Sequence, residues 1–143
     1  MTTKQLESQL RTSLLIIAVY LLCTGCAMLA APRHVASTMN ALARAASLAP
    51  ALRNEEAARE FLPLMGGVLV PLSFYYAYNA RSVQFARSSL YGRAIATAIL
   101  LVQYARSVTS AIVLSGVIVD ILCGLWTYSI LTKLDSMTTI KRK

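Results

Sequence analysis

Asp120 is the residue in this chain whose position most strongly implies chemistry. It lies in the middle of the longest apolar run, residues 110–132, SAIVLSGVIVDILCGLWTYSILT. A charged side chain at the centre of a membrane-spanning helix costs roughly 2.5–3.5 kcal/mol on insertion scales, and such groups usually face a bundle interior and are paired. The run therefore predicts an inward-facing acid that has a partner elsewhere in the chain.

The clear candidate for that partner is Arg93, in the preceding apolar run. An α-helix rises about 1.5 Å per residue, and Arg93 and Asp120 lie about 14 and about 13 residues from the turn that separates the two runs. Their depths in an antiparallel hairpin therefore match. Small residues that allow close helix contact bracket both charges at helical spacing: Ser89 and Thr97 around Arg93, and Gly116 and Gly124 around Asp120.

Tyrosines are expected to complete a polar cluster with this ion pair. The same counting places Tyr75 and Tyr76 near the depth of Arg93, and Tyr20 lies at about mid-depth in the first run. A phenol can donate a hydrogen bond to a carboxylate. The candidate catalytic residues are Asp120, as general acid or base, and Arg93. The candidate ligand-binding residues are Tyr75, Tyr76, Tyr20 and Glu60, which opens the second run.

The same ion pair also has a structural interpretation. A buried pair can fix the register of packed helices without adding much net stability, and Arg93 is close enough to the end of its run to extend to lipid head groups. The sequence thus predicts either a polar pocket that binds an apolar ligand or a pair that only holds the helices in register. Whether the protein is an enzyme stays open at this point.

The elements that must position these residues are four apolar runs of spanning length, for which about 17–25 residues are needed. Of the 143 residues, 57% are apolar and only 14% are charged, whereas a soluble domain carries about 25% charged residues. We therefore expect an all-α, four-helix membrane bundle in one domain, with spans at about 12–31, 61–78, 88–105 and 110–132. The first run has the basic flank of a signal peptide, but its length favours a retained helix.

The segments around the second run have features of their own. Pro63 and Pro71, with two glycines between them, predict a kink in the second spanning helix. The long loop, residues 32–60, contains a stretch at 37–49 with apolar side chains on one helical face, which predicts a short helix that lies on the membrane or caps the bundle. Asn54 is a suitable N-cap, so the second helix is expected to begin before its apolar run.

The net charge of +8 comes from Lys and Arg residues that flank the apolar runs. This placement is typical of topology signals and of contacts to anionic lipids, and the bias in Lys and Arg places both termini in the cytosol. No basic stripe interleaves with aromatics, which disfavours nucleic-acid binding. The expected location is the endoplasmic reticulum or another cellular membrane. The expected partners are membrane lipids, a lipophilic ligand, and a membrane protein or a second copy of the chain.

No metal or other cofactor is expected. Cys23 and Cys26 have the spacing of a redox or metal motif, but they lie inside an apolar run without a nearby His or second Cys pair. We interpret them as small packing residues. Tyr128, near the end of the fourth run, is interpreted as part of the interfacial aromatic belt.

The second half of the chain resembles a loosely defined group of small, largely uncharacterised four-helix integral membrane proteins. The matching features are Tyr75-Tyr76 with Arg81, Ser89-x-x-x-Arg93, Gly116-x-x-x-Asp120 and Trp126-Thr127. A weaker resemblance, to the membrane-associated eicosanoid and glutathione metabolism family, is carried by Arg53-Asn54-Glu55 and Glu60-Phe61-Leu62-Pro63. Both resemblances imply a four-helix fold. The spacing of the second signature differs from that family's and no Arg/Tyr motif follows, so glutathione is not added to the expected ligands.

Together these features predict a small multi-pass membrane protein that binds a lipophilic molecule, such as a polyketide or terpenoid biosynthetic intermediate. If it is an enzyme, the pair would convert that molecule by acid/base catalysis without a cofactor. The alternative is a non-catalytic accessory or scaffold subunit that packs against a larger membrane complex, which the stripes of small residues suggest.

Overall fold

The computed structural model of the protein describes residues 2–45, 55–105 and 113–140. The helices in this part of the chain are α1 (Thr3–Ala30), α2 (Pro32–Ala45), α3 (Glu55–Tyr78), α4 (Val83–Ala105) and α5 (Val113–Ile140). Among the described residues, four helices are long and apolar enough to cross a membrane, namely all except α2. The prediction of an all-α chain with four helices of spanning length is therefore confirmed.

The helices extend beyond the apolar runs that predicted them. The segments whose length and hydropathy suit a membrane span are Thr3–Ala30, Phe61–Tyr78, Val83–Val102 and Val117–Met137. A helix ends where its backbone is capped or broken, and hydropathy alone does not mark that point. At the start of α1, the Thr2 hydroxyl accepts a hydrogen bond from the Gln5 N–H at 3.3 Å, and the Thr2 N–H donates to Gln5 Oε1 at 2.8 Å. This capping box begins α1 at Thr3, well before residue 12.

The helix in the long loop begins earlier than predicted, at Pro32 rather than at residue 37. Proline suits the first position of a helix, since its missing N–H would have no intrahelical partner there. Ala36 and Ala43 are buried, and Ala36 packs in a small cluster with Leu62 of α3. The predicted part of this helix beyond Ala45, together with Asn54, lies outside the described residues.

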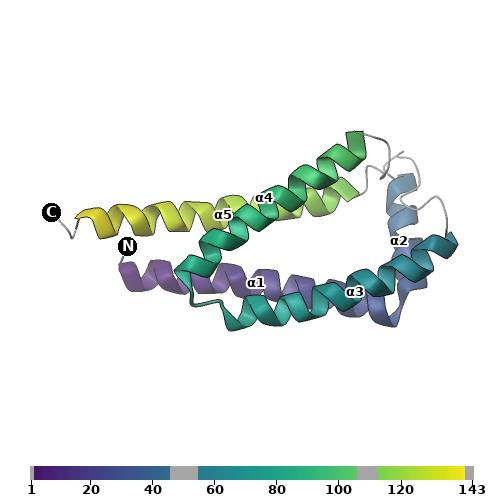
Figure 1. Ribbon diagram of the computed structural model, residues 1–143, viewed down its shortest axis with the longest axis horizontal. Coiled ribbons are helices and arrows are strands. Elements are labelled where there is room, and N and C mark those ends of the chain that lie inside the picture. The colour runs from purple at the N-terminus through teal and green to yellow at the C-terminus, as the bar shows by residue number, and fades with distance from the viewer. Residues whose placement is uncertain (1, 46–54, 106–112, 141–143) are drawn as a thin grey trace.

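The helices form two antiparallel pairs, α1 with α3 and α4 with α5 (Figure 1). The pairs are joined where α5 packs against α1, and the main core lies there. Its buried side chains recur at helical spacing and include Leu6, Leu10 and Leu14 of α1 and Ile130, Leu131 and Leu134 of α5. The start of α1 and the end of α5 lie toward the same end of the bundle (Figure 1).

Helices α1 and α3 approach closely at two glycines. A Cβ atom placed on Gly66 would lie 2.7 Å from the carbonyl oxygen of Gly25 and 2.9 Å from Leu29 Cγ. The helix α3 continues through Pro63 and Pro71 to Tyr78, so the prolines do not interrupt this contact. The α1–α3 pair therefore depends on the absence of a side chain at Gly66.

Gly66→Ala should destabilise the protein by about 1–3 kcal/mol, because the added methyl group overlaps the α1 backbone. Gly67→Ala is the matched control: nothing lies within 4 Å of a Cβ atom at Gly67, and alanine is the better helix former. Unfolding in detergent micelles should show a lower transition midpoint for Gly66→Ala alone. Equal midpoints for the two variants would mean that α1 and α3 do not meet at Gly66.

Candidate functional site

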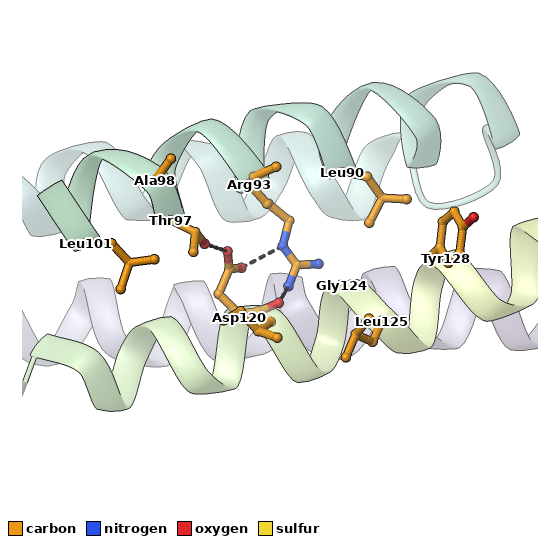
Figure 2. Close-up of a pocket in the computed structure, with 11 residues that line it drawn as sticks. Leu90, Arg93, Thr97, Ala98, Leu101, Asp120, Gly124, Leu125 and Tyr128 are labelled. Carbon is orange, nitrogen blue, oxygen red and sulfur yellow. Dashed lines mark hydrogen bonds and ion pairs between the residues drawn. The ribbon is translucent and has the colours of Figure 1, made fainter.

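Arg93 of α4 and Asp120 of α5 form the ion pair that depth counting predicted. Arg93 Nε donates to Asp120 Oδ1 at 2.6 Å, and Nη2 donates to the backbone carbonyl oxygen of Asp120 (Figure 2). Thr97 donates from its hydroxyl to Asp120 Oδ2 at 3.2 Å. Helix α4 therefore binds both carboxylate oxygens and one backbone carbonyl of α5.

Local sequence explains how these groups meet. Arg93 and Thr97 are four residues apart in a helix, so their side chains leave α4 on the same face. Gly124 lies one turn beyond Asp120 in α5, and a Cβ atom there would be 3.9 Å from Arg93 Nη2. The absence of a larger side chain at Gly124 leaves the Asp120 carbonyl open to the guanidinium group.

A second ion pair, Arg87 with Asp135, joins the same two helices nearer the end of α5. Both side chains are more than half exposed, and exposed ion pairs typically contribute little stability. The Arg93–Asp120 pair differs from it in burial: the Arg93 side chain is 10% exposed and the Asp120 side chain 35%.

The Arg93–Asp120 pair forms the polar part of a groove between α4 and α5, with a volume of about 390 Å³ (Figure 2). This volume lies within the range of small-molecule sites, about 300–1,000 Å³. The remaining lining is apolar apart from Thr97 and the Tyr128 hydroxyl. It comprises Leu90, Ala94, Ala98 and Leu101 of α4 with Ile121, Gly124, Leu125 and Tyr128 of α5.

One guanidinium nitrogen of Arg93 takes no part in the hydrogen bonds to Asp120. Nη1 is buried and has no hydrogen-bond acceptor among the described residues. In Figure 2 it is the guanidinium nitrogen without a dashed line, and it points along the groove on the side of Gly124 and Tyr128. A buried donor without an acceptor costs about 1–3 kcal/mol, and more when it is charged. The groove therefore contains a strong donor that lacks an acceptor.

The three predicted tyrosines lie in different surroundings. Tyr76 is buried, with its ring edge-on to Phe85 at a centroid distance of 5.0 Å. Its phenol lies near Ser89, Arg93 and Asp120. Tyr76 is nevertheless not part of the groove lining.

Tyr75 and Tyr20 are not brought to the groove. Tyr75 is 57% exposed and Tyr20 45% exposed, and neither is among the groove-lining residues. Counting residues along a helix predicts the depth of a side chain but not its direction around the helix axis. The side chains of consecutive residues such as Tyr75 and Tyr76 point about 100° apart. Glu60 lies in the second turn of α3, and its side chain is outside the described residues.

Sequence reasoning missed two contributions to the site. Thr97 was expected only as a small residue at a helix contact, although its position one turn from Arg93 is the signal for a shared partner. Tyr128 was expected in the interfacial belt, but it lines the groove. Its spacing from Asp120 and Gly124, at two turns and one turn, places the three residues on one face of α5.

The described residues contain no group of three or more His, Cys, Asp or Glu side chains that could hold a metal ion. Cys23 and Cys26 are exposed free thiols on α1, and Cys123 is a half-buried free thiol on α5. Comparison of the chain with protein-family models, curated proteins and solved structures found no match.

Within the groove, the charges of Arg93 and Asp120 neutralise each other. Both carboxylate oxygens already accept a hydrogen bond, whereas Nη1 remains free to donate. The arrangement is therefore better suited to bind an acceptor group than to exchange a proton with it.

Replacing one member of the pair should be much more damaging than replacing both. Arg93→Met or Asp120→Leu alone leaves a charge without its partner and should destabilise the protein by about 2–4 kcal/mol, below the upper end of the usual range because Asp120 is 35% exposed. The double variant should lose no more than about 1 kcal/mol. Denaturation in detergent micelles measures all three, and additive losses would show that the two side chains do not interact.

Proposed function

We propose that this chain is an integral membrane protein that binds a lipophilic small molecule in the groove between α4 and α5. The observation that carries this proposal is the buried Nη1 of Arg93, a donor without an acceptor in an otherwise mostly apolar groove. Sites for small molecules typically combine apolar walls with a few placed polar groups. The groove has this composition.

The exposed surface of the helices supports a setting in the bilayer. Large apolar side chains are exposed on every helix, including Leu64, Ile95 and Leu122. In water such surface would be costly, whereas in lipid it faces hydrocarbon. Leu101 and Leu125 in the groove wall are also exposed, so a lipophilic molecule can reach the groove from the acyl chains without crossing water.

Binding is the form of the proposal that the geometry supports best. A polyketide or terpenoid intermediate is the expected kind of ligand, because such molecules combine an apolar skeleton with single oxygen atoms. The same proposal can be extended from binding to catalysis, with Asp120 converting the bound ligand as a general acid or base. It requires Asp120 to exchange a proton while Arg93 and Thr97 are bound to its two oxygens.

A bulky side chain at Gly124 should block the groove. Gly124→Leu fills the space beside the guanidinium group, whereas Gly67→Leu adds the same side chain at a position with nothing within 4 Å. We expect photolabelling by 4-octylbenzophenone in proteoliposomes to map to the groove segments of the original chain and of Gly67→Leu. Gly124→Leu should show about tenfold less labelling there, a loss of about 1.4 kcal/mol in binding.

Labelling that is the same in Gly124→Leu and Gly67→Leu would exclude the groove as the binding site. Folding of each variant is checked by its elution in size-exclusion chromatography. A misfolded Gly124→Leu sample is replaced by Gly124→Val, which adds a smaller branched side chain to the same space.

We further propose that both chain termini face the cytosol, as the Lys and Arg distribution predicts. Supporting this, the start of α1, the turn between α3 and α4 and the C-terminal part of α5 lie toward the same end of the bundle (Figure 1). These segments contain the exposed basic residues Lys4, Arg81 and Lys133. In a cysteine-free background, and in sealed membrane vesicles with their cytosolic face outward, a membrane-impermeant thiol reagent should label Lys4→Cys directly. Arg33→Cys, on α2 at the other end, should be labelled only after the vesicles are permeabilised, and the reverse pattern would invert the topology.

A further inference from the structure

We infer that the groove selects lipophilic molecules whose polar end is a neutral oxygen acceptor, such as a ketone or ester carbonyl, over those that end in a carboxylate. This inference rests on the proposed function, because it names the class of molecule that the same groove binds. It follows from three features of the groove: its charge balance, the guanidinium nitrogens that remain free, and the space beside them.

The first feature is charge. Arg93 and Asp120 are the only charged residues that line the groove within the described part of the chain, and they neutralise each other. A neutral ligand keeps this balance. A carboxylate would add an uncompensated negative charge beside Asp120, in surroundings where burying an unpaired charge is expensive.

The second feature is which guanidinium nitrogens are free. Arginine binds a carboxylate best through two parallel N–H donors that form a fork. In this groove, the fork formed by Nε–H and one N–H of Nη2 is already bound to Asp120, through its carboxylate and its backbone carbonyl. Nη1 is the guanidinium nitrogen without an acceptor. One neutral ligand oxygen is enough to satisfy it, so the site needs no second, charged oxygen.

The third feature is the space beside the guanidinium group. Gly124 contributes no side chain there, and a Cβ atom at this position would meet Arg93 Nη2 and Leu90 Cδ2 only at 3.9 Å. Apolar side chains of Leu90 and Leu125 flank the same part of the groove (Figure 2). An apolar skeleton can therefore lie against these walls while its oxygen accepts from Nη1.

Competition for the photolabelled groove tests this inference on the unmodified chain. The competitors are 2-tridecanone, tridecane and tridecanoate, with the carboxylate studied at about pH 9, well above its ordinary pKa of about 4. The ketone should displace 4-octylbenzophenone at about tenfold lower concentration than the alkane, as expected for about 1.4 kcal/mol from one hydrogen bond. Tridecanoate should displace it no better than tridecane.

Paired variants identify the source of this preference. Arg93→Met with Asp120→Leu removes the donor and keeps the groove apolar, so the ketone and the alkane should compete within about twofold of each other. Arg87→Met with Asp135→Leu is the matched control, because it removes the exposed ion pair of the same two helices. This control should keep the tenfold preference for the ketone.

The outcomes separate this inference from the proposed function. Groove labelling with equal competition by ketone and alkane, or with strongest competition by tridecanoate, overturns the inference and leaves lipophile binding intact. A ketone preference that survives in Arg93→Met with Asp120→Leu also overturns it. If the groove of the unmodified chain is not labelled at all, the result contradicts the proposed function itself. The comparison of competitors needs no variant, so poor folding of a variant does not prevent the test.

Discussion

The hydrogen bonds of one guanidinium group, that of Arg93, hold α4 against α5. Arg93 binds the side chain and the backbone carbonyl of Asp120, and Thr97 binds the remaining carboxylate oxygen. In the proposed lipid setting, apolar side chains give no hydrophobic force between helices, so polar contacts and close packing decide which helices associate. Much of the α4 surface beyond Arg93 is exposed, so this polar contact constrains the register of that part of α4.

This constraint also creates the groove, so the structural and functional interpretations of the pair are not exclusive. Nε and Nη2 of Arg93 serve the helix contact, and Nη1 is left as a donor in the groove. A lysine in place of Arg93 would not divide its donors in this way, because its ammonium is a single point charge without a planar fork. One side chain can therefore fix the hairpin and still offer a directed hydrogen bond to a bound molecule.

Some of this arrangement follows from the sequence, and some does not. The Arg93–Asp120 pair was predictable because helical rise is nearly constant, so distance along the chain converts into depth. Direction around the axis was not predictable in the same way, which is why Tyr75 and Tyr20 lie away from the groove while Tyr76 is buried. The start of α1 depends on a cap at Thr2 that hydropathy does not detect. The free Nη1 depends on which acceptors Arg93 reaches, and residue types and spacing do not determine this.

Helix α5 contributes to the core and to the groove at different points along its length, with the core residues nearer its C-terminal end. Thr127 and Leu131 face α1, where the Thr127 and Ser13 hydroxyl oxygens lie 3.4 Å apart in the core. Asp120, Gly124 and Tyr128 recur every four residues and line the groove. Because a Cβ atom at Gly124 would meet only Arg93 and Leu90 of α4 within 4 Å, a larger side chain there can change the groove without touching the α1–α5 contact. The Arg93–Asp120 pair lacks this independence, because any change at Arg93 alters both the donor in the groove and the contact between α4 and α5.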